Sequence, residues 1–201
     1  MGIHSNALRQ LAQQIFSVQE QRQLLSILST TPFPLEEMID FDLILGGPSM
    51  ARMDCHNSGR YHVNDRAVFR PLQYCGSYLE MADGAKEIVW LTREIVHMSG
   101  LHLETTLKRV GQTSMPWPLG QLLYDRTVKS KVDAILRGQI GQFLRVYNAS
   151  KHDVDQPKDT HLFSLEDSII AYAVSRKIGV QLYPHAKLYT NVAIFETDCP
   201  S

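Results

Sequence analysis

Apolar residues recur every three or four positions along most of this chain, which is the spacing of one face of an α-helix. Over residues 5–29 the pattern predicts a single amphipathic helix with Ser5 or Asn6 as its cap. The TTPFP segment at 30–34 ends this helix, because proline lacks an N–H donor and restricts the residue before it. The predicted apolar face consists of Leu8, Leu11, Ala12, Ile15, Phe16, Leu24, Leu25 and Leu28.

A second helical stretch is predicted over residues 72–110. Gly84 and Gly100 are the expected positions of a kink or a break, because glycine weakens a helix interior. The segment 111–120 contains two prolines around a tryptophan and is predicted to be a connector. A short helix over 119–124 is expected to follow.

Two more helices are predicted in the C-terminal half. Residues 128–150 form one of them, and the other begins after Ser164, which makes a capping box with Asp167. The last turn of this second helix is expected near Arg176, since a cation suits the negative end of a helix, and Gly179 fits the residue just past it.

The rest of the chain gives weaker signals. Residues 30–66 are rich in turn-forming residues and are predicted to be an irregular insertion, with a short helical turn over 35–45. The tail, residues 180–201, alternates in polarity and predicts a strand or a small hairpin. Together these elements predict an all-α fold: one domain over 1–201, built as an antiparallel bundle of four or five helices with a minor extended segment at its C-terminal end.

Composition narrows the classes of function. Of the 201 residues 44% are hydrophobic and 20% are charged, and the formal net charge is -1, so any site for an anion must be local. We expect no membrane partner, since the apolar runs are too short to span a bilayer and the N-terminus has no signal-peptide pattern. The odd number of cysteines, Cys55, Cys75 and Cys199, favours unpaired thiols and a cytoplasmic protein.

The segment RVYNASKH (145–152) carries the strongest candidate chemistry. Arg145, Asn148 and His152 lie at positions i, i+3 and i+7 and share one face if the segment is helical. Small residues continue this stripe toward the N-terminus, which favours close approach of another helix, either within the fold or from a second copy of the chain. Those small residues are Ala134, Gly138 and Gly141.

These side chains suit metal-independent cleavage of RNA. His152 can act as base or acid near neutral pH, and Arg145 can stabilise the charge on a phosphate. Asn148 can orient the imidazole or a ribose hydroxyl, while Tyr147 and Lys151 are candidates for contacts with the RNA backbone. No metal and no cofactor are required. The surrounding segment from 125 to 153 has six Lys or Arg against three Asp, which fits contacts with phosphate.

With its arginine and its histidine near a helix end, this segment resembles the motif of HEPN domains, and the helical bundle is similar to that family too. The resemblance covers mainly residues 119–178. Six residues separate Arg145 from His152, which is the upper limit of the family pattern, and Val146 stands where the family usually has a polar residue. The resemblance implies a ribonuclease of toxin–antitoxin or phage-defence type that acts as a homodimer, with an antitoxin or regulatory protein as a further partner.

Two other interpretations of this segment stay open. Some HEPN proteins are catalytically inactive dimerisation modules or modules that bind nucleotides or RNA. The polar residues from Asn148 onward also fit the ordinary end of a helix, where asparagine and a histidine near the last carbonyl groups are favourable.

A metal-bound regulator is a further alternative, based on the loop residues Asp54, Cys55, His56, His62 and Asp65. The loop lacks the paired ligand spacing of known zinc motifs, which favours an ordinary polar loop. His97 and His102 lie five positions apart in a predicted helix, so they are expected in the core or at its boundary.

Overall fold

Helix α9 (Leu165–Leu182) is buried along almost its whole length and lies at the centre of the fold. The computed structural model describes residues 3–50, 61–82, 89–152, 163–193 and 195. The predicted capping box begins α9: the Ser164 hydroxyl accepts a hydrogen bond from the Asp167 N–H at 3.1 Å, and the Asp167 carboxylate accepts one from the Ser164 N–H at 2.8 Å. This helix start is therefore confirmed.

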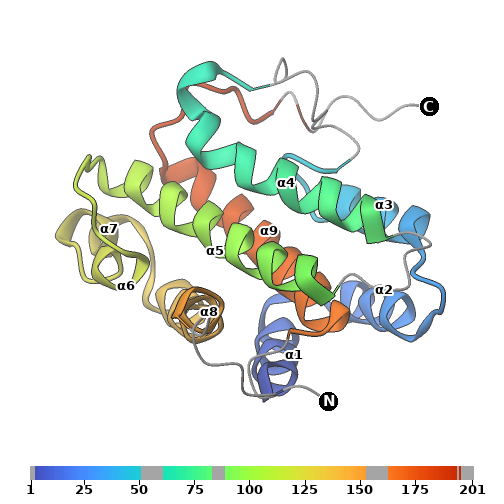
Figure 1. Cartoon of the computed structure of the whole chain (residues 1–201). Helices are drawn as coiled ribbons and strands as arrows, with labels where there is room; N and C mark the ends of the chain where they lie inside the picture. Colours follow the sequence, from blue (N-terminus) through green and yellow to red (C-terminus); the bar gives the residue numbers. More distant parts are fainter. Residues whose placement is uncertain (1–2, 51–60, 83–88, 153–162, 194, 196–201) are drawn as a thin grey trace.

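Helix α5 (Val89–Gly111) lies beside α9 and runs in the same direction (Figure 1). The Thr92 hydroxyl donates to the Phe163 carbonyl at 2.6 Å near one end, and the Lys187 N–H donates to the Arg109 carbonyl at 3.3 Å near the other. Helix α4 (Arg66–Ala82) covers α5 in the opposite direction. These three helices form the body of the molecule.

The remaining helices surround this body. In Figure 1, α8 is seen end-on, so it crosses α5, and it also packs on α1. No helix in the described parts of the chain is long and apolar enough to cross a membrane. No strand occurs in these parts either, so the predicted all-α bundle is confirmed. The described residues form nine α-helices rather than the predicted four or five, and α5 and α9 are parallel rather than antiparallel. The other helices are α1 (Ile3–Ile15), α2 (Val18–Ser29), α3 (Leu35–Ile44), α6 (Leu119–Leu122), α7 (Arg126–Lys131) and α8 (Ala134–His152).

The prediction of one helix over 5–29 is wrong, because Ser17 begins a second helix. Its hydroxyl accepts from the Glu20 N–H at 3.3 Å, and the Glu20 carboxylate accepts from the Ser17 N–H at 2.7 Å. Ser5 is not a cap either: it lies inside α1, and its buried hydroxyl donates to Asp167 at 2.7 Å.

The stretch predicted over 72–110 with a kink or break, and the single helix predicted over 128–150, each contain two described helices. The first becomes α4 and α5, and Gly84, one of the two expected breaks, lies outside the described residues. The second becomes α7 and α8, because the Asp133 carboxylate accepts a hydrogen bond from the Leu136 N–H at 2.8 Å and starts a new helix.

The short helical turn predicted over 35–45, within the region 30–66, is present as α3, whose Asp42 is fully buried. Arg176 of α9 is buried too, and its Nε donates to the Asp42 carboxylate at 2.7 Å. Arg176 therefore does not mark the end of α9, which continues to Leu182. A buried charge is tolerated only with such a partner.

The tail also differs from its prediction. In its described part, the residues expected to form a strand continue α9 and then form the 3-10 helix η4 (Tyr183–His185). Gly179 lies inside α9 rather than past its end, and a Cβ added there would lie 2.5 Å from Nε2 of His102. Here glycine allows α5 and α9 to approach closely.

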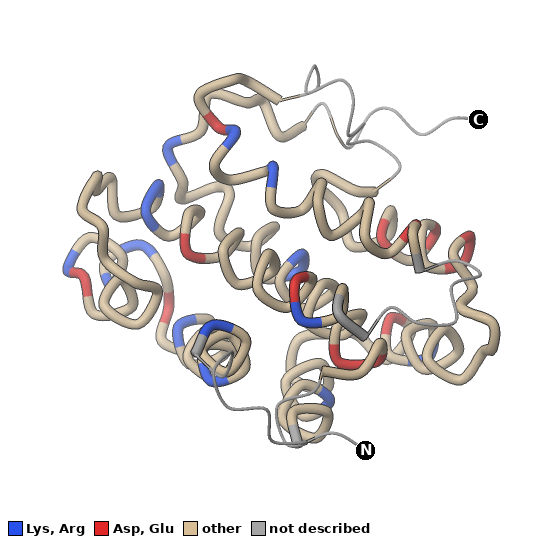
Figure 2. The backbone as a smooth tube through the Cα atoms, in the orientation of Figure 1, with Lys and Arg blue, Asp and Glu red and all other residues tan. Residues whose placement is uncertain are grey.

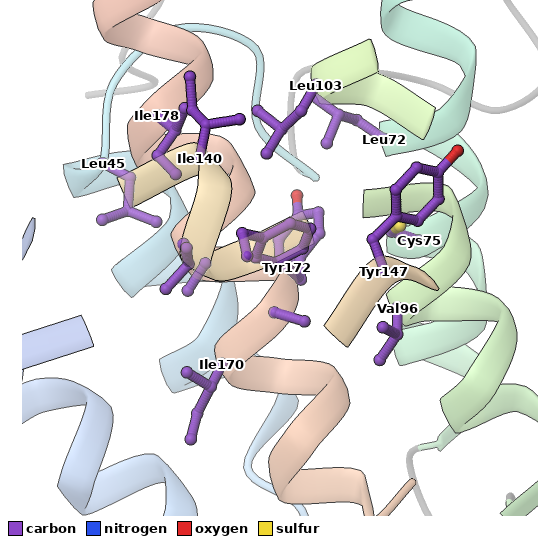
Figure 3. Packing of buried hydrophobic residues seen from close by; sticks show 14 of the residues in the cluster. Leu45, Leu72, Cys75, Val96, Leu103, Ile140, Tyr147, Ile170, Tyr172 and Ile178 are labelled. Atoms are coloured by element: carbon purple, nitrogen blue, oxygen red, sulfur yellow. The ribbon is translucent and has the colours of Figure 1, made fainter. Parts of the chain in front are cut away.

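Gly100 lies within a continuous α5, so the predicted break at this position is wrong. A Cβ added at Gly100 would lie 2.0 Å from Cδ2 of Tyr147, which inserts its ring from α8 into the core (Figure 3). Gly100 is therefore required for the crossing of α5 and α8. By contrast, a Cβ added at Gly138 of α8 would have no atom within 4 Å.

We expect Gly100→Ala to lower the free energy of unfolding by about 2 kcal/mol or more, because the methyl group overlaps a buried ring. Gly138→Ala is the matched control and should raise it by up to about 1 kcal/mol, because alanine favours the helix and has free space there. Urea unfolding measures both values. Equal effects of the two substitutions would contradict the packing role of Gly100.

Candidate functional site

Helix α8 has one buried face and one exposed face. The buried face contains the large side chains that hold α8 against α5 and α1, which are Leu136, Ile140, Phe143, Val146 and Tyr147. Arg145 and Asn148 lie on the exposed face, one turn apart. The helix contains three Lys or Arg and no Asp or Glu, so this face is locally positive (Figure 2).

The stripe of small residues lies on the surface. Ala134 and Gly138 are exposed, Gly141 is half-buried, and a Cβ added at either glycine would have no atom within 4 Å. These glycines are therefore not needed for packing against another part of the described chain. Of the two predicted reasons for the stripe, close approach within the fold is excluded for the described residues, and approach of a second copy remains.

Arg145 and Asn148 make no hydrogen bond or ion pair with the described part of the chain. No described residue therefore competes with a ligand for these two side chains. His152 is the last residue of α8, and the helix places it seven positions after Arg145, two turns further on the same side. The side chain of His152 lies outside the described residues.

Tyr147 and Lys151, expected as contacts to an RNA backbone, are instead bound within the protein. Tyr147 is buried, and its hydroxyl donates to the Glu104 carboxylate at 3.3 Å. The Lys151 ammonium lies 3.3 Å from the same carboxylate and 3.8 Å from the centroid of the Tyr147 ring. The hydroxyl of Tyr147 is not available to RNA, because the core encloses it.

Glu104 of α5 organises this region. Its carboxylate also accepts from the Lys108 ammonium at 3.1 Å and from the Leu119 N–H at 3.2 Å, so it joins α5, α6 and α8. Burial would raise the pKa of Glu104, but Lys108 and Lys151 outweigh burial and lower it. Burial, together with the charge of Glu104, raises the pKa of Tyr147.

Helix α5 brings two further basic groups to the end of α8 that sequence reasoning did not assign to the site. The Arg93 Nε donates to the Ser150 carbonyl at 2.9 Å, two residues before the end of α8. The ring of His97 lies 5.8 Å from that of Tyr147, centroid to centroid. Burial lowers the pKa of His97, and Lys151 and Arg93 lower it further against the effect of Glu94, so its imidazole is neutral at pH 7. Arg93 and His97 lie at positions i and i+4 of a predicted helix, and this spacing is the signal in the sequence that places them on one face.

The loop residues considered for a metal do not form a site in the described structure. One oxygen of the buried Asp65 carboxylate accepts from the N–H groups of Tyr189 at 2.8 Å and Thr190 at 2.6 Å. The other oxygen has no hydrogen bond in the described structure and lies 3.6 Å from Arg109. The described residues contain no group of three or more metal-binding side chains. Of the other loop residues, His62 accepts a hydrogen bond from the Asn64 N–H at 3.1 Å through its Nδ1, and Asp54, Cys55 and His56 lie outside the described range.

The remaining candidates for chemistry lie in the core. Cys75 is an unpaired, buried thiol whose pKa burial raises to about 12, so it is not a nucleophile near neutral pH. His102 is fully buried between the Val68 carbonyl and the Tyr183 hydroxyl, at 2.8 Å and 3.2 Å. Burial lowers the pKa of His102 to about 4, which fits a structural role.

No protein-family model matches the chain, and neither a curated protein nor a solved structure is significantly similar to it. The resemblance to HEPN domains therefore rests on the RVYNASKH segment and on the helical bundle.

Glu104→Gln should lower the free energy of unfolding by about 1–3 kcal/mol, since it leaves the Lys108 and Lys151 contacts without a charged partner. Because the pKa of Glu104 lies below its ordinary value of 4.5, the carboxylate contributes fully above that pH, and the contribution is lost as the pH falls through the lowered pKa. Urea unfolding at pH 7 and at pH 3 should therefore show a smaller deficit at the lower pH. The exposed Glu80 provides the control, Glu80→Gln, and an equal deficit in both variants would contradict this role.

Proposed function

We propose that this chain is a metal-independent ribonuclease of toxin or defence type that acts as a homodimer through the exposed face of α8. The observation that supports this most is the pair formed by Arg145 and Asn148. Both side chains are exposed on a helix with no acidic residue, and neither has a partner in the described structure. A surface arginine without an internal partner is available to bind a phosphate through paired donors.

In the proposed reaction the 2′-hydroxyl of the RNA attacks the adjacent phosphorus. The O2′–P bond forms as the P–O5′ bond breaks, which yields a 2′,3′-cyclic phosphate and a 5′-hydroxyl. His152 either accepts the proton of the 2′-hydroxyl or donates one to the leaving 5′ oxygen. Arg145 stabilises the negative charge on the non-bridging oxygens, and Asn148 orients the imidazole or the ribose.

Ion pairing within the region selects which cations can serve this reaction. Glu104 neutralises Lys108 and Lys151 in part, since it contacts both. Arg145 keeps its full charge for a ligand, because no carboxylate in the described structure contacts it. In the proposed site Arg145 is thus the main phosphate-binding residue, and Lys151 stabilises the end of α8.

The proposed homodimer forms through the same exposed face of α8. Gly138 and Gly141 leave room beside α8, so the helix of a second copy could lie close along the stripe. Two sets of Arg145, Asn148 and His152 would then share one cleft. The second candidate, a catalytically inactive module that dimerises or binds RNA, uses the same surface and differs only in lacking cleavage.

Arg145→Ala and His152→Ala should each abolish cleavage of single-stranded RNA in the presence of EDTA, while the far-ultraviolet circular dichroism stays that of the wild type. Exposed Arg126 of α7 provides the control, and Arg126→Ala should cleave normally. Cleavage with a 2′,3′-cyclic phosphate end by the wild type, lost in both variants, supports the ribonuclease. A wild type that binds but does not cleave any RNA would favour the inactive module.

Gly138→Arg should prevent dimerisation and cleavage together, because a long side chain enters the space that a second helix would occupy. The fold should remain intact, since Gly138 is exposed and a Cβ added there meets no atom of the described structure within 4 Å. Analytical ultracentrifugation gives the oligomeric state, and Gly138→Ala is the matched control. A Gly138→Arg variant that is still dimeric would show that the dimer does not use this stripe.

A further inference from the structure

Helix α4 presents basic and aromatic side chains in a regular line. Arg66, Arg70, Tyr74 and Tyr78 recur at every fourth position, so they lie along one side of the helix. Arg66, Arg70 and Tyr74 are exposed, and Tyr78 is half-buried. We refer to these four residues as the α4 stripe.

The flat groups of the α4 stripe are already arranged for stacking. The rings of Tyr74 and Tyr78 are separated by 6.3 Å between centroids and are inclined by only 17°. Arg70 lies over the Tyr74 ring, 5.6 Å from its centroid, and its Nε donates to the Tyr74 hydroxyl at 3.0 Å. The guanidinium group is therefore oriented by its neighbour, although no core contact requires it.

Charge along α4 is positive where the stripe is exposed. Figure 2 shows basic positions in the N-terminal half of α4. The acidic residue of this helix, Glu80, lies about 120° around the helix from Tyr74 and so does not share its face. Burial raises the pKa of the Tyr78 phenol, and the charge of Glu94 of α5 raises it further. Phosphates are thus favoured near Arg66 and Arg70, and uncharged bases near Tyr78.

The C-terminal end of the α4 stripe lies near the proposed catalytic face. Helix α4 packs on α5, and the charge of Glu94 of α5 acts on Tyr78. The residue before Glu94, Arg93, donates to the Ser150 carbonyl near the end of α8, which also packs on α5. One helix, α5, therefore separates the stripe from the last turn of α8, so one extended strand could cross from one to the other.

We propose that the α4 stripe binds single-stranded RNA, with phosphates on Arg66 and Arg70 and bases stacked on Tyr74 and Tyr78. This inference rests on the proposed function and deepens it, since it says where the substrate lies. Aromatic faces and arginine are the groups that proteins use to hold unpaired bases and their backbone. Two arginines are too few for a membrane surface, which attracts clusters of about four to eight basic residues.

The test is the binding of a short, fluorescently labelled 2′-O-methyl RNA of mixed sequence, which lacks the attacking hydroxyl and cannot be cleaved. Tyr74→Ala should raise the Kd about tenfold, the usual effect of removing one stacking partner. Tyr74→Phe should bind like the wild type, because the ring remains. Arg70→Ala should lower the slope of log K against log salt by about 0.7, as expected for one lost phosphate contact, and Tyr74→Ala should not change that slope.

The matched control is Tyr124, which is 77% exposed and has the Lys129 ammonium 5.3 Å from its ring centroid. Tyr124→Ala should leave the Kd unchanged. Equal losses from Tyr74→Ala and Tyr124→Ala would overturn the inference, as would equal binding of a duplex, whose bases are not free to stack. If Tyr74→Ala weakens binding but no RNA is cleaved, the stripe stands and the ribonuclease fails. If RNA is cleaved but Tyr74→Ala binds normally, the ribonuclease stands and the α4 stripe is not its RNA-binding surface.

Discussion

The buried ion pair between Asp42 and Arg176 is the contact on which the rest of the fold depends. The Asp42 carboxylate also accepts hydrogen bonds from the Met50 N–H at 2.5 Å and the Tyr172 hydroxyl at 3.2 Å. A second nitrogen of Arg176 donates to the Gly46 carbonyl at 2.8 Å. Since neither charge contacts solvent, each can exist there only with these partners, and together they hold α3 and the loop after it against α9.

This pair fixes how α9 is rotated, and the rotation decides what the other helices can contact. Gly179 lies one turn after Arg176, about 60° around α9, and there the helix packs on α5 and admits the ring of His102. In turn, α5 presents Gly100 to the Tyr147 ring of α8. A chain of close contacts thus runs from a buried charge to the helix that carries the candidate site.

The candidate site consists of polar side chains of α8 that this packing does not use. Glu104 binds the groups of α8 that point toward α5, namely Tyr147 and Lys151. Arg145 and Asn148 are exposed and have no partner among the described residues, and so they keep their capacity to bind a ligand. The α4 stripe is left free in the same way on the other side of α5. The proposed substrate path joins two surfaces that the core does not need.

Local signals in the sequence determined the helical content and several helix boundaries. The capping box of Ser164 and Asp167 and the apolar face of α8 were both predictable, because they depend on residues a few positions apart. Arg145 and Asn148 could be grouped for the same reason. The equivalent box at Ser17 was present in the sequence too, but the continuous apolar pattern hid it.

Only the tertiary structure decided which polar residues form hydrogen bonds or ion pairs inside the fold. Arg176 has the sequence context of a helix end and is the partner of a buried aspartate 134 positions away. Lys151 has the context of a ligand contact, yet it serves Glu104 of another helix. The sequence determines which residues share a helix face through spacing along the chain. It does not reveal which helix faces pack against each other. Ion pairs and the packing of aromatic rings depend on residues that the fold brings together from distant positions in the chain.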